Sequence, residues 1–204
     1  MKSKTLSWQI KKDRDALRDF LRENQVCLGT SDTILGLLAP VTSEGAQKLN
    51  QIKQRSEKPY IILMPSKEEL SAFIDQKLTA QVQKIIDTCW PGPLTLIFKA
   101  KPEYARLAQS KTGTVGVRVP DHKGLLAVLS HFDGLFSTSA NKTGQLFPKS
   151  FSDVDPAILQ EVACLIDDQE QKPEIASTIL DCSGSEIKVI REGAFMINKI
   201  RELL

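Results

Sequence analysis

Hydroxyl and amide side chains gather in one stretch of the chain, directly after the apolar pair Leu135-Phe136. This polar stretch reads Ser137-Thr138-Ser139-Ala140-Asn141-Lys142-Thr143-Gly144. Hydroxyls and carboxamides can donate and accept hydrogen bonds, so the stretch can hold a polar ligand without contributing a fixed charge. Two cationic segments could converge on it, one at 53–58 and one around Arg118. Together these pieces predict a site for an anion and a hydroxylated small molecule.

The cations of the first segment are Lys53, Arg55 and Lys58, which lie at the predicted end of a helix and just before a predicted strand. Arginine offers a planar fork to phosphate oxygens and lysine a mobile point charge, a combination that suits a polyphosphate. The alternative is that these cations only interact with the dipole at a helix C-terminus.

Arg118 lies between Val117 and Val119 in an apolar run, so we expect its side chain on the opposite face of a strand. An arginine in such a strand needs an anionic partner or solvent, because burying it unpaired is costly. A structural salt bridge would satisfy it. We favour a ligand carboxylate, because Pro120 and Asp121 turn the chain away directly afterwards.

Three further polar residues have two interpretations each. Ser31 follows a predicted strand, where a loop often meets ligand or where a serine caps a helix. Ser177 and Arg191 could contact ligand or be ordinary residues of a strand and its end. The sequence has no Walker A loop, Gly-x-Gly-x-x-Gly fingerprint, Gly-x-Ser-x-Gly elbow or His-Glu-x-x-His motif, and no evident general base or nucleophile. This favours catalysis by positioning and charge neutralisation.

The elements that must position these residues follow from hydrophobic periodicity. Helices are predicted over 15–24, 44–53 and 79–89, and a capping-box signature at Ser66-Lys67-Glu68-Glu69 predicts another helix through Phe73. Short apolar runs predict strands at 26–28, 60–64, 94–98, 115–119, 135–136, 163–166, 177–181 and 187–190. Strands that alternate with helices indicate an α/β layer structure. Because some of the strands follow one another without a helix, the sheet is predicted to be mixed.

Length, charge and cysteine content limit the class of protein that this sequence can encode. A length of 204 residues fits one domain, over 1–204 with the motif-bearing part at about 7–195. The net charge of +2 argues against a protein wrapped in nucleic acid. Four cysteines without a Cys-x-x-Cys pair, and an N-terminus without an apolar leader, predict a cytoplasmic protein with reduced thiols. The two histidines lack the spacing of a helical zinc site, so we expect no metal held by protein ligands. The nearly apolar run 34–41 is too short to span a bilayer.

Taken in order along the chain, the motifs resemble the Sua5/YciO/YrdC family. The matching blocks cover nearly the whole chain: Ser31-Asp32-Thr33-Ile34-Leu35-Gly36-Leu37, Lys53-x-Arg55 with Lys58-Pro59, Trp90-Pro91-Gly92-Pro93-Leu94-Thr95, Thr114-Val115-Gly116-Val117-Arg118-Val119-Pro120, Ser137-Thr138-Ser139-Ala140-Asn141 with Gly144, Ser177-Thr178-Ile179-Leu180-Asp181, and Ile190-Arg191-Glu192-Gly193. The resemblance implies a single-domain, twisted mixed β-sheet with flanking helices and a concave, positively charged cavity.

The resemblance also implies an activity, in which L-threonine, bicarbonate (or CO2) and ATP give L-threonylcarbamoyladenylate and pyrophosphate. ATP is then a substrate, and Mg2+ is carried by its triphosphate rather than by a protein cage. Partners downstream would be tRNA or tRNA-modification proteins, with no membrane. By position, the resemblance assigns ATP binding to Lys53, Arg55, Lys58, Thr114, Ser139, Asn141 and Arg191, and threonine binding to Ser31, Arg118, Ser137 and Ser177. Lys53 and Arg55 would stabilise charge during catalysis without a covalent nucleophile.

The first block departs from the family pattern. Thr30, Ser31 and Leu35 stand where the family usually has proline, threonine and tyrosine, and the interval from Arg55 to Lys58 is one residue shorter than usual. Two alternatives therefore remain: a paralogue like the YciO branch without threonine-dependent activity, and an RNA-binding module of the same fold. The near-neutral charge and the scarcity of tyrosine and tryptophan argue against the second, because stacking on bases needs aromatic rings.

Overall fold

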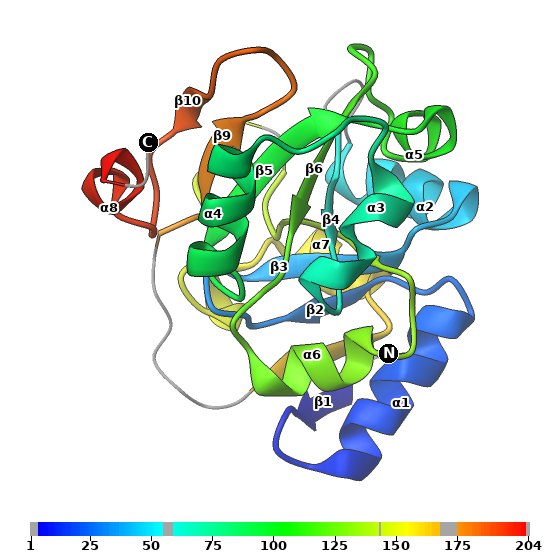
Figure 1. Cartoon of the computed structure of the whole chain (residues 1–204). Coiled ribbons are helices and arrows are strands. Elements are labelled where there is room, and N and C mark those ends of the chain that lie inside the picture. The colour runs from blue at the N-terminus through cyan, green and yellow to red at the C-terminus, as the bar shows by residue number, and fades with distance from the viewer. Residues whose placement is uncertain (1–3, 55–58, 143, 168–174, 203–204) are drawn as a thin grey trace.

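All the strands that can be described pair into one mixed sheet, as predicted (Figure 1). The structure is a computed structural model that describes residues 4–54, 59–142, 144–167 and 175–202. The strand order in the sheet is β1-β8-β2-β3-β7-β4-β6-β5-β9-β10. The bounds are β1 Lys4–Ser7, β2 Cys27–Gly29, β3 Gly36–Pro40, β4 Ile61–Leu63, β5 Leu94–Lys99, β6 Thr114–Arg118, β7 Leu135–Ser139, β8 Cys164–Asp167, β9 Thr178–Asp181 and β10 Lys188–Arg191.

The pairing at the centre of the sheet brings distant motifs together. Strand β7, which carries the start of the polar stretch, lies between β3 and β4 and is antiparallel to both. Strand β4 is parallel to β6, and β6 is antiparallel to β5. In this register Leu63 of β4 lies opposite Leu135 on one side and opposite Arg118 on the other. The hydroxyl-rich strand and the arginine strand are thus separated by a single strand.

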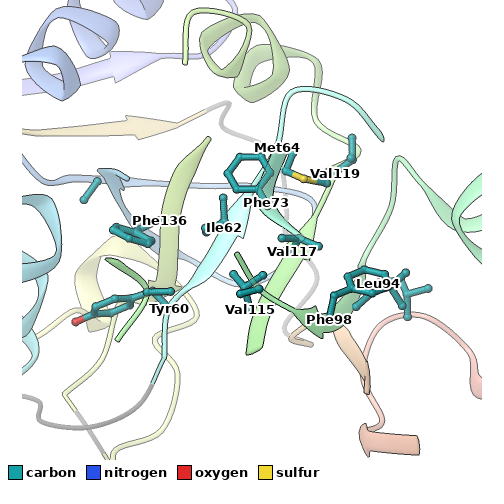
Figure 2. Packing of buried hydrophobic residues seen from close by; sticks show 14 of the residues in the cluster. Tyr60, Ile62, Met64, Phe73, Leu94, Phe98, Val115, Val117, Val119 and Phe136 are labelled. Carbon is teal, nitrogen blue, oxygen red and sulfur yellow. The ribbon is translucent and has the colours of Figure 1, made fainter. Parts of the chain in front are cut away.

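One core cluster packs between the sheet and several of the helices. These helices are α2 Ser43–Lys53, α3 Leu70–Phe73, α4 Ala80–Cys89, α5 Pro102–Leu107, α7 Pro156–Glu161 and α8 Ile197–Arg201. Figure 2 shows part of this cluster, in which Ile62, Val117 and Phe136 come from three adjacent strands. The rings of Tyr60 and Phe136 lie 5.5 Å apart between their centroids. Because Val117 belongs to this cluster, its neighbour Arg118 projects from the other face of the sheet.

A second, smaller cluster covers only part of that other face. It contains Leu17 and Leu21 of α1 (Lys11–Arg22) together with Leu125 and Leu129 of α6 (Lys123–Leu129), each pair at the four-residue spacing of one helical face. The two helices contact each other and lie beside β1 (Figure 1). Leu135 at the start of β7 belongs to this cluster. Beyond it the same face carries the polar side chains of the candidate site.

The structure differs from the sequence prediction in several places. Strand β3 was not predicted, because Gly36 and Pro40 at its two ends look like strand breakers. Strand β1 and the short helices α5 to α8 are too brief to show a clear period. The predicted capping box at Ser66 is wrong: the segment opens with a 3-10 turn at Lys67–Glu69, and the Ser66 side chain makes no cap hydrogen bond. Among the described residues, no helix is long and apolar enough to cross a membrane.

Candidate functional site

A cavity of about 660 Å³ lies over the centre of the sheet, on the face that α1 and α6 leave open. Its lining comes from the 31–36 segment and from β4, β5, β6, β7, β9 and β10, so distant parts of the chain build one site. Seven of the predicted binding residues line it: Ser31, Thr114, Arg118, Ser137, Ser139, Ser177 and Arg191. Thr33, Thr95 and Thr138 also line it and were not assigned a ligand from the sequence. The predicted convergence of Arg118 with the polar stretch is therefore met by the geometry.

Arg118 ends β6, and its side chain is 6% exposed. Its Nε donates to the backbone oxygen of Gly92 at 3.0 Å, and Nη1 donates to Oγ1 of Thr33 at 3.0 Å. Nη2 forms an ion pair with Oδ1 of Asp32. The structural salt bridge that the sequence left open is therefore present. A guanidinium has five N–H groups, and these three contacts use one on each nitrogen. Nη2 is buried, so the second hydrogen of Nη1 is the candidate donor to a ligand.

Burial is the main influence on the charge of Arg118 and lowers its pKa, whereas the Asp32 carboxylate beside it raises the pKa again. Arginine starts from so high a value that the guanidinium stays protonated at neutral pH. The Arg118–Asp32 pair thus brings a fixed, shielded pair of opposite charges to the edge of the cavity.

The loop that carries Ser31 is held from both sides. Oγ of Ser31 accepts from the backbone N–H of Thr33 and lies 3.2 Å from Oγ1 of Thr33. Asp32 Oδ2 accepts from the backbone N–H of Asp121 at 3.0 Å. Before the loop, Nε1 of Trp8 donates to Oγ1 of Thr30 at 3.0 Å, and both side chains are buried. Thr30 replaces the proline of the family pattern, and this hydrogen bond anchors the start of the loop in another way.

Arg191 approaches the cavity from the end of β10. Its Nε and Nη2 donate to the backbone oxygen of Ser177 at 3.0 and 2.8 Å, and Nη2 lies 3.3 Å from Oγ of Ser177. That hydroxyl is 2.8 Å from Oγ1 of Thr95, which is fully buried. Burial lowers the pKa of Arg191, and the charge of Arg118 lowers it further. The two guanidiniums therefore repel each other, and an anion in the cavity would relieve that repulsion.

Lys53 and Asn141 do not line the cavity but lie buried behind its Ser139 edge. The Lys53 ammonium, at the end of α2, donates to the backbone oxygen of Ser139 and contacts Oδ1 of Asn141 at 3.4 Å. Ser139 Oγ donates to the same amide oxygen, and Asn141 Nδ2 donates to the backbone oxygen of Gln145. In this arrangement Lys53 fixes the end of β7. Arg55 and Lys58 lie outside the described residues.

Sequence reasoning assigned no ligand role to Asp32 or Thr95, which contact the predicted site residues Arg118 and Ser177. Asp32 stands inside a matched block, next to Ser31, but a lone acid in a loop gives no sign that it contacts an arginine 86 positions later. Thr95 closes another block and looks like an ordinary strand residue. Among the described residues, no group of three or more His, Cys, Asp or Glu side chains could hold a metal ion.

An open mixed sheet, with two arginines and several hydroxyl side chains lining a cavity on its uncovered face, defines an α/β domain with a polar candidate site. Residues 19–193 match the Sua5/YciO/YrdC family model, which is described by the words "Telomere recombination". That match covers most of the chain, so the protein belongs to the Sua5/YciO/YrdC family.

Curated relatives point the same way. The chain is 31% identical over 192 residues to a putative threonylcarbamoyl-AMP synthase of Methanocaldococcus jannaschii, covering 93% of this chain and 90% of that protein. It is 34% identical over 129 residues to the threonylcarbamoyl-AMP synthase of Klebsiella pneumoniae, covering 61% of this chain and 68% of that protein.

Solved structures share the fold. The crystal structure of Pyrococcus abyssi Sua5 complexed with L-threonine has a TM-score of 0.89 at 24% identity, over 98% of this chain and 60% of that chain. The chain therefore spans about three fifths of that Sua5 protein. E. coli YciO has a TM-score of 0.81 at 20% identity, over 97% of this chain and 99% of that chain.

Proposed function

We propose that the protein synthesises L-threonylcarbamoyladenylate from L-threonine, bicarbonate or CO2, and ATP, with release of pyrophosphate. The product would supply the threonylcarbamoyl group of N6-threonylcarbamoyladenosine at position 37 of tRNA, and the enzyme would be a cytoplasmic nucleotidyltransferase. The observation that carries the proposal is that Arg118 and Arg191 face one hydroxyl-lined cavity of about 660 Å³. That volume lies within the roughly 300–1,000 Å³ of sites that enclose small ligands. The names of the curated relatives support the reaction.

The threonine side of the site follows from the position of Arg118. The remaining N–H of Nη1 in its guanidinium would hold the substrate carboxylate, with Ser31 at one side of it. Ser137 and Ser177 supply hydroxyls that can donate to or accept from the threonine hydroxyl. Held in this way, the bound ammonium first loses a proton to solvent; the resulting amine attacks CO2 at carbon, and the nitrogen releases a second proton to solvent to give a carbamate.

The nucleotide side of the site uses the remaining cations. A carbamate oxygen attacks the α-phosphorus of ATP, the bond from that phosphorus to the bridging oxygen breaks, and pyrophosphate leaves with the electron pair. Arg191, with Lys53, Arg55 and Lys58, would offset the charge that develops on pyrophosphate, which is the main task in phosphoryl-type transfer. Thr114, Ser139 and Asn141 would contact the nucleotide. Mg2+ would arrive on the triphosphate oxygens, because the cavity lining offers arginines and hydroxyls rather than an acidic cage.

The direct test is pyrophosphate release from ATP and bicarbonate, measured with each of the common amino acids in turn. We expect release that depends on threonine. Release without threonine dependence would instead support a YciO-like paralogue, and tRNA binding that ATP does not alter would support an RNA-binding module. Either result in place of threonine-dependent release contradicts the proposal.

A matched variant tests the carboxylate contact. Arg118→Lys keeps a positive charge beside Asp32 but cannot offer a planar fork. We expect its threonine affinity to fall at least about tenfold, since charge-assisted hydrogen bonds are worth ~1.5–3 kcal/mol, while its ATP affinity stays near that of the wild type. Calorimetric titrations that show equal threonine affinity in both proteins would remove Arg118 from the site.

A further inference from the structure

The arginine that faces the cavity from β6 already has a counter-charge within the protein. Asp32 Oδ1 forms the ion pair with Arg118, and the two side chains are 11% and 6% exposed. The other carboxylate oxygen, Oδ2, accepts from the backbone N–H of Asp121 at 3.0 Å. Both oxygens of the Asp32 carboxylate are therefore held, and rotating the side chain away would break the ion pair and the hydrogen bond. The subsite that would receive a ligand carboxylate has no net charge.

This neutrality has an electrostatic consequence for the ligand. A simple carboxylic acid, ionised at neutral pH, would add an unpaired negative charge to a shielded pair that is already balanced, and Asp32 would repel it. A zwitterionic α-amino acid adds no net charge. Its ammonium group is attached one carbon from the carboxylate, so a carboxylate on Arg118 leaves the ammonium within the attractive field of Asp32.

Arg191 brings a further positive charge to the cavity, held at Ser177 rather than beside Asp32. Its guanidinium is hydrogen-bonded to the uncharged backbone oxygen and hydroxyl of Ser177, and no acidic group forms an ion pair with it among the described residues. Its charge is therefore open to a second anion, which in the proposed reaction is the triphosphate. The cavity thus contains one arginine with an internal counter-ion and one without.

We propose that Asp32 is a specificity-determining residue that makes the Arg118 subsite select a zwitterionic α-amino acid over a carboxylate that lacks the amine. This inference rests on the proposed function only in taking Arg118 as the site of the amino-acid carboxylate. Asp32 acts through its charge, not by contact with the reacting atoms.

The test compares two ligands that differ only in the ammonium group, L-threonine and (R)-3-hydroxybutanoate, titrated by calorimetry into the wild type and into Asp32→Asn. Asparagine keeps an oxygen for the Asp121 N–H and removes the charge. In the wild type we expect threonine to bind at least about tenfold more tightly, equivalent to ~1.4 kcal/mol. In Asp32→Asn we expect that ratio to fall to roughly threefold or less, chiefly because the analogue binds more tightly.

Asp121→Asn is the matched control, because it removes an exposed carboxylate from the neighbouring turn and should leave the ratio unchanged. A purely structural role for Asp32 would weaken both ligands in parallel, and that result would overturn the inference. Equal affinities of the wild type for the two ligands would also overturn it, and that measurement does not depend on any variant folding. Failure of the proposed function would be seen separately. The wild type would then show the expected ratio of affinities for the two ligands but would release no pyrophosphate in response to threonine.

Discussion

Because Asp32 and Arg118 form a buried ion pair, substitutions at the two residues should have non-additive effects on the free energy of unfolding. Removing one partner of a buried pair leaves the other charge uncompensated, at a cost of about 3–5 kcal/mol. We therefore expect Arg118→Met to lower the free energy of unfolding by that amount, measured by urea denaturation. Asp32→Leu should lower it by a similar amount. A domain in the upper part of the typical range of ~5–15 kcal/mol remains largely folded after such a loss.

The double variant gives the sharper result. With both charges removed, the desolvation cost of the pair disappears too, and replacing such pairs by apolar groups is often neutral. What remains lost is the hydrogen bonding of Arg118 to the Gly92 oxygen and to Thr33, and that of the Asp121 N–H to Asp32, at about 1 kcal/mol per bond. The double variant should therefore be more stable than Arg118→Met alone, with a coupling free energy of at least about 2 kcal/mol.

A matched pair on the surface provides the control. Lys67 and Asp87 also form an ion pair, but their side chains are 39% and 48% exposed. Exposed pairs contribute little because solvent screens them, so the same cycle there should leave stability indistinguishable from the wild type. If the cycle on Asp32 and Arg118 gives the same near-zero coupling, the reasoning about a shielded counter-charge is refuted.

Three further predictions concern other parts of the molecule. Lys53→Ala should weaken ATP binding roughly tenfold by calorimetry and spare threonine binding, because it removes a charged donor from the edge of β7; unchanged ATP affinity would take Lys53 out of the nucleotide site. Trp8→Phe should lower the free energy of unfolding by ~1–2 kcal/mol in urea, because the Thr30 hydroxyl loses its buried donor. Equal free energies of unfolding for Trp8→Phe and the wild type would contradict this. Burial raises the pKa of Cys182 to about 12. The unfolded thiol ionises above about pH 8.5, so this group's contribution to stability is complete below that pH and falls between there and pH 12; Cys182→Ala should show a shallower alkaline decline.

Local patterns in the sequence predicted those parts of the fold that depend on near neighbours. The alternation of Val117, Arg118 and Val119 correctly placed the arginine on the face opposite the valines, because strand side chains alternate whatever the strand's partners are. The helices over 44–53 and 79–89 were predicted to within a residue of their observed bounds, because each shows a clear apolar stripe.

The contacts that define the site could not be predicted in the same way. Arg118 donates to Thr33 across 85 positions and Lys53 to Ser139 across 86, and both contacts depend on the order of strands in the sheet. That order places β7 between β3 and β4, which no local pattern indicates. The family resemblance grouped the blocks into one site. It did not show that Lys53 lies behind the cavity edge or that Asp32 already pairs with Arg118.

Two glycines in the cavity lining keep the floor of the cavity free of side chains. Gly36 of β3 and Gly116 of β6 both line the cavity, although glycine weakens a strand. A Cβ at Gly116 would meet its nearest neighbour at 3.5 Å, which is ordinary van der Waals contact, and one at Gly36 would meet the Thr138 backbone oxygen at 3.4 Å. Packing within the sheet therefore does not require either glycine. Their missing side chains leave room above the strands, between the arginine and the hydroxyls, where the proposed substrates would lie.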